Sequence, residues 1–362
     1  MTGDLQPWGK WDLEMAQFAV DDINKSGGVL GGRKLKFDVV DDKSDFAANG
    51  AAAALQTINA GATVIVTDCD SGWGAPAQLA AQTKGVGSLS WCGGAPQFGA
   101  KGGLGPLTSS GGIATQNEAA VPAEWGYAKK GWKKAYLLND PTLAYDTTYC
   151  NSFAARFKQL GGTIVGQDEF QQTASSIATQ ITRLKDTSPK PDVIVVCSTP
   201  PGGATAVRQL RAAGINTTLQ MSDGMAGNNW LASVPGLTNA YVSTYAAQNG
   251  TDPIAKVNEL TKRWQQTYHS QVPIPDVYNA YADMQLIAAA INKAGSDNPK
   301  AIAQALATTK NAGTILGKHT LQPGYNLSFT SPVAILKISN NRDTFETRQA
   351  PEINAVTLLG KK

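Results

Sequence analysis

Polar and aromatic residues follow five short apolar runs of the sequence, at the points where those runs end. The five segments read "DCDSGWG" after residues 63–67, "WCGGAP" after 85–90, "DPTLAYD" after 135–139, "STPPGG" after 192–197 and "SDG" after 218–221. If the runs are strands of an open parallel sheet, these segments lie at its carboxyl edge, where such sheets bind ligands. The opposite ends carry ordinary Gly-Lys and Pro-Asp connections. The asymmetry predicts a binding site at one edge of the sheets.

Several residues in the first two segments have both a structural and a ligand-binding interpretation. Ser71 would cap the helix that follows it, and the same helix start offers backbone N–H groups that suit a carboxylate. Gly93 and Gly94 would form a turn or let a ligand approach the backbone closely. Trp73 and Trp91 would pack in the core or form a flat apolar wall beside a ligand.

The later segments leave the same choice open. Tyr145 would lie in the core or present its hydroxyl to a cleft. Asp223 would cap the next helix or pair with a ligand amine. The sequence alone does not decide between these roles.

Residue patterns typical of catalysis are missing from the sequence. It contains no G-x-S-x-G, no H-E-x-x-H, and no G-x-G-x-x-G that opens a helix after the first strand. His269 and His319 are the only histidines, and we expect both on the surface. The four cysteines show no C-x-x-C spacing, which argues against a zinc or redox site. We therefore expect binding without catalysis, and no metal or cofactor.

The chain alternates between short apolar runs and longer amphipathic ones, which favours helices packed on parallel sheets. The predicted strands are residues 35–40, 63–67, 85–90, 135–139, 163–166, 192–197 and 218–221. After residue 244 the alternation stops, and three helices and a last strand at 332–338 are predicted. A glycine-rich stretch at 98–112 separates two sets of units. We expect an α/β protein of two lobes, with the chain crossing between them more than once.

Composition limits the possible partners. The chain has 362 residues, 16% of them charged, and a net charge of +3, which is too small and scattered to indicate nucleic acid. The basic run "KKGWKK" is expected in a solvated loop. No apolar stretch approaches the length of a membrane span. The first residues, "MTGDLQPWGK", do not resemble a signal peptide, so we expect either a cytosolic protein or one whose leader has been removed.

The order of these segments resembles the extracytoplasmic solute-binding proteins of branched-chain-amino-acid-type ABC importers, which have the type I periplasmic-binding fold. The segments that carry the resemblance are "FAVDDINKSGGVLGGRKLKFDVVDD", "VIVTDCDS", "LSWCGGAP", "LLNDPTLAYD", "VRQLRAAGI" with "SDG", and "VYNAYADMQLIAAAI". The resemblance covers nearly the whole chain. Each motif alone is loose, and their order and spacing are specific.

The resemblance implies two Rossmann-like lobes with parallel central sheets, joined by three crossover segments. Lobe 1 would comprise residues 1–110 and 246–320, and lobe 2 residues 111–245 and 321–362. The lobes would close by a hinge around an amino acid or a small carboxylate, which the protein would deliver to a membrane permease. It implies an extracytoplasmic monomer with its signal sequence removed. A regulatory amide or amino-acid sensor of the same fold remains the alternative, and an α/β enzyme with an unrecognised site is a third class.

Carried over to this sequence, the resemblance assigns roles to individual positions. Ser71 and the backbone at Gly93 and Gly94 would hold a ligand carboxylate. Lobe 2 would contribute Tyr145 and Thr199, and Asp223 would bind an α-ammonium group.

The sequence departs from the family pattern at Gly93 and Gly94, where the usual Ala-Thr is replaced and room is gained. Trp91 or Trp73 would fill that room as an aromatic wall, with Trp8 and Tyr278 adding to it. Such a cleft suits a ligand larger or flatter than valine.

Disulfides become plausible if the protein works in an oxidising compartment. Cys69 and Cys92 end adjacent predicted strands, so a bridge there would join two ligand-facing turns. Cys150 and Cys197 fall in the same predicted lobe and are a second candidate pair.

Overall fold

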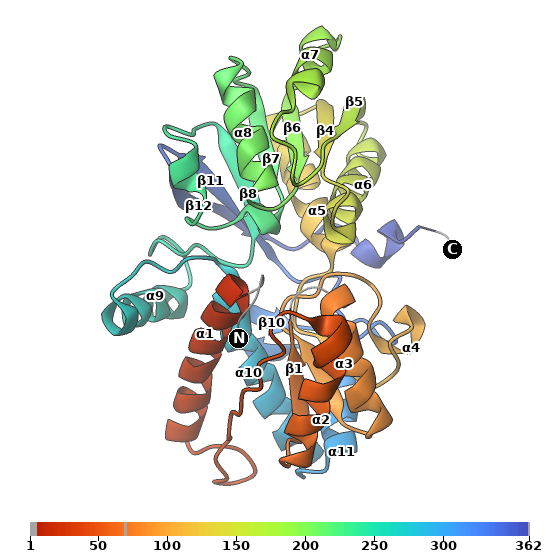
Figure 1. Cartoon of the computed structure of the whole chain (residues 1–362), viewed down its shortest axis with the longest axis vertical. Helices are drawn as coiled ribbons and strands as arrows, with labels where there is room; N and C mark the ends of the chain where they lie inside the picture. The colour runs from red at the N-terminus through yellow and green to blue at the C-terminus, as the bar shows by residue number, and fades with distance from the viewer. Residues whose placement is uncertain (1–5, 69–70, 361–362) are drawn as a thin grey trace. The chain divides into compact units, whose positions relative to one another are not determined.

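The computed structural model describes residues 6–68 and 71–360, except for the side chains of residues 6–8, 46–47 and 71–73. The chain divides into two compact units, each built from two stretches of sequence (Figure 1). Unit 1 comprises residues 1–114 and 276–331, and unit 2 comprises residues 115–275 and 332–362. The chain therefore crosses between the units three times, after residues 114, 275 and 331. This agrees with the α/β fold of two lobes and three crossovers.

The boundaries differ from those implied by the resemblance, mainly because residues 246–275 belong to unit 2. The side chain of Asn249 donates to Asp343, and Arg348 Nη2 lies 2.8 Å from Asp252 Oδ2. Both contacts tie residues just after 245 to the last strand of unit 2. Residues 321–331 belong to unit 1, where the backbone N–H of Ala114 donates to the Ser328 carbonyl at 2.8 Å.

Unit 1 contains a three-stranded parallel sheet in the order β1-β2-β3 and a two-stranded antiparallel ribbon, β9-β10. Its elements are α1 (Gln6–Lys25), η1 (Phe46–Gly50), α2 (Ala51–Asn59), β1 (Val64–Thr67), α3 (Ser71–Thr83), β2 (Gly87–Ser90), α4 (Gly99–Gly102), β3 (Thr108–Ser110), α10 (Asp276–Ala294), α11 (Pro299–Ala307), β9 (Ala312–Thr314) and β10 (Gly317–His319). The predicted helix at the start of the chain ends where expected, because Gly27 and Gly28 have positive φ angles of 107° and 71°.

The strand predicted at residues 35–40 is wrong, because these residues form no strand in the structure. The side chain of Asn24 binds both the N–H and the carbonyl of Leu35, at 2.7 and 2.9 Å. A cavity of about 430 Å³ is lined by Phe37 and its neighbours together with the residues of β1. Within the described residues, β1 therefore pairs only with β2.

Unit 2 is built on a seven-stranded sheet in the order β12-β11-β8-β7-β6-β4-β5. Its elements are α5 (Thr115–Trp125), η2 (Gly126–Lys130), β4 (Lys134–Asn139), α6 (Ala144–Gln159), β5 (Thr163–Glu169), α7 (Ala178–Asp186), β6 (Val193–Cys197), α8 (Gly202–Ala212), β7 (Thr218–Met221), η3 (Asp223–Met225), η4 (Leu231–Ser233), β8 (Ala240–Thr244), α9 (Ala255–Tyr268), β11 (Val333–Ser339), β12 (Arg342–Gln349) and η5 (Ala355–Leu358). Strands β4 to β8 run parallel to one another. Strand β11 pairs antiparallel with β8, and β12 pairs antiparallel with β11. The sheet is therefore mixed at one edge.

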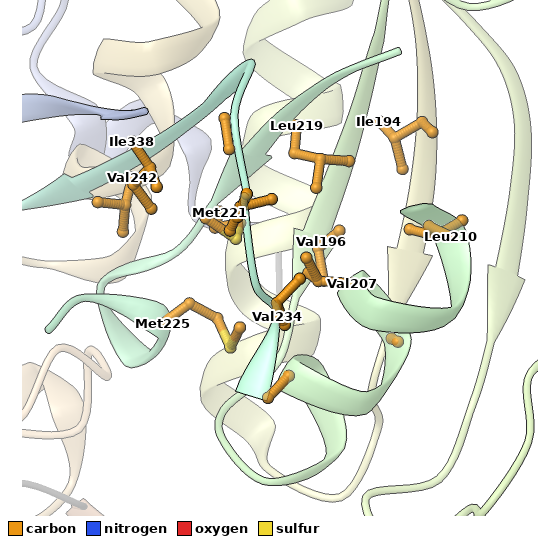
Figure 2. Packing of buried hydrophobic residues seen from close by; sticks show 14 of the residues in the cluster. Ile194, Val196, Val207, Leu210, Leu219, Met221, Met225, Val234, Val242 and Ile338 are labelled. Carbon is orange, nitrogen blue, oxygen red and sulfur yellow. The ribbon is translucent and has the colours of Figure 1, made fainter. Parts of the chain in front are cut away.

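The core of unit 2 explains why its strands could be recognised from the sequence. All five residues of β6 are buried, as expected for a strand with helices on both faces. One face of the sheet packs on α7 and α8, and Figure 2 shows part of this cluster, with Val196 of β6 and Met221 of β7 beside Val207 of α8. The other face is covered by α5 and α6. This two-sided packing fixes the sheet whose carboxyl edge carries the polar segments.

Candidate functional site

The carboxyl ends of four parallel strands lie side by side in unit 2. Asn139 of β4 pairs with Cys197 of β6, and Met221 of β7 pairs with Val242 of β8. The residues that follow these strands therefore gather at one edge. Strand order also reverses at β4, which lies between β5 and β6. Such a reversal is where open α/β sheets form ligand-binding crevices.

The floor of this edge is fixed by buried polar contacts and a disulfide. The Ser198 hydroxyl donates to Asp140 Oδ2 at 2.9 Å, and the Asp140 N–H donates to the Cys197 carbonyl at 2.9 Å. Cys197 is bonded to Cys150 of α6, with 5.8 Å between their Cα atoms. The second candidate pair of cysteines is thus confirmed. It ties α6, which carries Tyr145, to the strand that precedes Thr199.

Four partly exposed residues lie on this floor: Tyr145, Thr199, Asp223 and Gly224. The Gly224 N–H donates to the Tyr145 hydroxyl at 3.3 Å. A Cβ added to Gly224 would lie 2.7 Å from Thr199 Cγ2 and 3.4 Å from Tyr145 Cε1. Glycine is therefore needed for the close approach of the three residues. Asp223 begins η3, whose N-cap is Ser222, and the Ser222 side chain makes no capping hydrogen bond.

Behind this exposed layer lies Glu118 of α5, which the sequence analysis missed. Its carboxylate accepts the Tyr145 hydroxyl at 2.9 Å from each oxygen, and Oε1 accepts the Asp223 N–H at 2.8 Å. The Ser243 hydroxyl lies 3.4 Å from the same oxygen and 2.8 Å from the Tyr149 hydroxyl. Glu118 is only 5% exposed. It therefore joins α5, α6, β8 and η3 around one carboxylate.

The electrostatics of this edge are negative. Burial raises the pKa of Tyr145 well above its usual value, and the nearby Glu118, Asp223 and Asp146 carboxylates raise it further. Burial and Glu118 also raise the pKa of Tyr149. Both phenols stay protonated near neutral pH. The edge as a whole favours a positively charged or hydrogen-bond-donating group.

The predicted site residues of unit 1 are only partly described. Trp8, Ser71 and Trp73 have side chains outside the described part of the structure, and Cys69 is outside it altogether. The Cys69–Cys92 pairing therefore stays a prediction. Tyr278 of α10 is fully buried.

The segment that contains Trp91 is well defined. Trp91 is 3% exposed, packs edge-on against Phe37 at 6.5 Å between ring centroids, and lines the 430 Å³ cavity. The Gly93 N–H donates to Ser90 Oγ at 3.1 Å. Gly94 is partly exposed, so its backbone is the more accessible of the two glycines.

Unit 1 also contains buried carboxyl groups that were not predicted, among them Asp12, Asp68, Asp276 and Asp283. Asp12 of α1 and Asp283 of α10 are fully buried, and Asp68 follows β1. Burial raises the pKa of Asp12 well above its usual value, and Asp276 and Asp68 raise it further. Burial and the nearby Asp12 carboxyl also raise the pKa of Asp283 well above its usual value. The raised pKa values of Asp12 and Asp283 favour the protonated forms of these two groups.

Other features of the described residues limit the chemistry. His319 is buried rather than on the surface, which corrects that prediction, and His269 is exposed as expected. In the described part of the chain, no group of three or more histidine, cysteine or acidic residues could hold a metal ion. Among the described helices, none is long and apolar enough to cross a membrane.

Comparison with known proteins decides the family. The family model for periplasmic binding proteins matches residues 1–343. The chain belongs to the periplasmic binding protein family. The resemblance stated from the sequence is thereby confirmed, and curated relatives agree with it. The Leu/Ile/Val-binding protein BraC3 of Rhizobium johnstonii is 28% identical over 324 residues, which cover 88% of this chain and 84% of the relative.

Solved structures of this family share the fold. A LivJ substrate-binding protein from Streptococcus pneumoniae, in complex with isoleucine, has a TM-score of 0.77 at 22% identity and covers 96% of each chain. A solute-binding protein from R. palustris, in complex with benzoate, has a TM-score of 0.76 at 18% identity. The match covers 97% of this periplasmic binding protein and 94% of the R. palustris chain.

Proposed function

We propose that this periplasmic binding protein is the solute-binding component of an ABC importer. It captures an amino acid or a small, possibly aromatic carboxylate and delivers it unchanged to a membrane permease. It acts outside the cytoplasm as a monomer. The Cys150–Cys197 disulfide supports this location, because disulfides persist in oxidising compartments.

The observation that carries the proposal is the exposed layer at the carboxyl edge of unit 2. Tyr145 of α6, Asp223 of η3 and Thr199 of the loop after β6 reach this edge, and hydrogen bonds to Glu118 hold Tyr145 and Asp223 in place. A few fixed polar groups at a strand-order reversal are typical of small-molecule sites. The relatives with isoleucine and benzoate bound are consistent with either proposed ligand class.

Each predicted residue has a proposed role. Asp223 binds a ligand ammonium group, and Tyr145 and Thr199 line the same edge. In unit 1, Ser71 and the accessible backbone of Gly94 remain the predicted carboxylate ligands, because the Gly93 N–H is already bonded to Ser90. The proposed aromatic wall rests on Trp8 and Trp73.

Trp91 and Tyr278 take a supporting role in this proposal. Both side chains are buried, so in this proposal they stabilise the segments that carry the predicted ligand contacts. Replacing either by Ala tests this, because a supporting residue changes stability more than ligand selectivity.

A calorimetric and thermal-shift screen tests the function, with L-amino acids, their 2-oxo acids and aromatic acids as ligands. A ligand at 100 times its Kd stabilises the native protein by about 2.7 kcal/mol, which raises the Tm by several degrees. We expect Asp223→Asn to weaken amino-acid binding by about 10- to 100-fold, the usual range for a hydrogen bond to a charged group. Asp186→Asn, at the exposed end of α7, is the matched control.

Mass spectrometry of the released ligand separates binding from catalysis. An importer component returns the ligand unchanged after prolonged incubation. Conversion of any bound ligand would contradict the proposal, as would the absence of a saturable shift with every compound of these classes.

A further inference from the structure

Tyr145 has one hydroxyl proton, and the structure shows where it goes. The hydroxyl donates to Glu118, with 2.9 Å to each carboxylate oxygen, and accepts the Gly224 N–H at 3.3 Å. A phenol has a single O–H donor and can accept further hydrogen bonds. The donor capacity of Tyr145 is thus already used within unit 2. Toward a ligand, this hydroxyl can therefore act only as an acceptor.

Glu118 is itself fixed as an acceptor. Its Oε1 receives the Asp223 N–H at 2.8 Å as well as the Tyr145 hydroxyl, and the Ser243 hydroxyl lies 3.4 Å away. The carboxylate is buried behind Tyr145 and does not share its exposed surface. It therefore acts on a ligand through Tyr145 and through the position of the Asp223 turn.

We infer that Glu118 is a positioning residue that fixes Tyr145 as a hydrogen-bond acceptor, so that unit 2 selects solutes by a hydrogen-bond-donating, cationic group. Tyr145 and Asp223 then form one corner that binds an ammonium and disfavours a carboxylate or ketone oxygen. The Thr199 hydroxyl accepts from Gln172 Nε2 at 2.7 Å and keeps its own proton for a ligand acceptor. The inference rests on the proposed binding function and names the ligand class that this half of the site accepts.

A Glu118→Gln substitution weakens the acceptor that holds the Tyr145 proton. The amide oxygen can still accept the Asp223 N–H, whereas the amide nitrogen takes the place of Oε2 and donates to the Tyr145 oxygen. The amide oxygen in the place of Oε1 still lies within reach of the Tyr145 hydroxyl, so the phenol proton is held by one neutral oxygen instead of a carboxylate and turns more readily to a ligand acceptor. Shape is conserved, so the variant changes which ligand groups are matched without removing a side chain.

The ligand-free test is infrared spectroscopy of protein labelled with ring-13C tyrosine. Subtracting the spectrum of Tyr145→Phe from that of the parent isolates the C–O stretch of Tyr145, whose frequency differs between a donating and a non-donating phenol. We expect the frequency of a donor to a carboxylate in the native protein and a clear shift in Glu118→Gln. A native band typical of a non-donating phenol would overturn the inference whatever the ligand.

The ligand test compares L-leucine with 4-methyl-2-oxopentanoate, which keeps the carboxylate and replaces the ammonium by a ketone, and with benzoate. We expect the native protein to prefer L-leucine by at least tenfold over the oxo acid, and Glu118→Gln to reduce that ratio at least tenfold. In the Tyr145→Phe background the same substitution is expected to have a much smaller effect. Glu169→Gln, at the exposed end of β5, is the matched control and should leave the ratio unchanged.

The outcomes separate the inference from the proposed function. Tight binding of the oxo acid or benzoate without L-leucine would overturn the inference and leave a binding protein in place. An equal loss of affinity for all three ligands in Glu118→Gln would assign Glu118 a purely structural role. If none of the three binds, the proposed ligand classes fail, and the infrared band alone decides the polarity of Tyr145.

Discussion

Asp343 of β12 makes the stability of unit 2 depend on pH near 6. The side chain is 4% exposed, and its Oδ1 accepts a hydrogen bond from Asn249. No hydrogen-bond partner of Oδ2 lies within the described residues. Burial raises the pKa of Asp343 from 3.8 to about 6, although its own backbone N–H and Arg342 act in the opposite direction. The native state therefore holds this proton more tightly than the unfolded chain.

The sign and size of the effect follow from this shift. Between pH 4 and 6 the native state binds more protons than the unfolded state, so the free energy of unfolding falls as pH rises through that window. A difference of about two pKa units corresponds to about 3 kcal/mol in the free energy of unfolding, and this contribution is fully lost above pH 6. Asp343→Asn removes the ionisation and keeps an oxygen for Asn249. We expect it to match the native protein at pH 4 and to exceed it by up to about 3 kcal/mol at pH 7.5.

Urea unfolding at half-unit steps from pH 4 to 8, followed by tryptophan fluorescence, measures this difference. The control is Asp186→Asn, because the Asp186 side chain is exposed. The reasoning is refuted if the difference between Asp343→Asn and the native protein stays constant with pH, or if it grows toward low pH.

Two further predictions concern stability. Burial lowers the pKa of His319 from 6.5 to about 4, so the native state binds this proton less tightly than the unfolded chain does. The free energy of unfolding of unit 1 should therefore fall by up to about 3 kcal/mol as pH falls from 6.5 to 4. Urea midpoints of the native protein and His319→Gln at pH 4.5 and 7.5 measure this, and an equal pH dependence in both would contradict it. Cys150 and Cys197 are 47 residues apart in the sequence. Closing a loop of that length removes conformational entropy from the unfolded chain and so stabilises the native state by about 4 kcal/mol. Replacing both by Ala should lower the free energy of unfolding by about that amount, and an unchanged urea midpoint would contradict the estimate.

The sequence predicted those elements whose pattern is local. The run "DVIVVC" became β6 because a strand buried on both faces needs only apolar residues. The strand β12 was missed, because "RDTFETRQ" is largely polar and pairs only with β11. Residues 35–40 have a strand-like alternation and yet form no strand. Pairing depends on a neighbour distant in the sequence, which periodicity does not reveal.

The candidate site shows the same difference between local sequence patterns and contacts with distant residues. Tyr145, Thr199 and Asp223 could be proposed from the sequence because they follow strands, where the fold class itself predicts ligand contacts. Glu118 could not, because it lies inside a helix and its partners are 27, 105 and 125 residues away. Its contribution exists only once α5 packs against α6 and the sheet.

The two layers of this edge have different consequences for specificity. A substitution in the exposed layer changes the groups that meet the ligand and is visible in the strand-end segments. A substitution at Glu118 leaves those segments intact but is expected to change how firmly the Tyr145 proton is held within unit 2. Two relatives that share Tyr145 and Asp223 but differ at position 118 should therefore prefer different ligand groups. We therefore propose that the ligand class of this protein depends on the buried Glu118 as well as on the residues that touch the ligand.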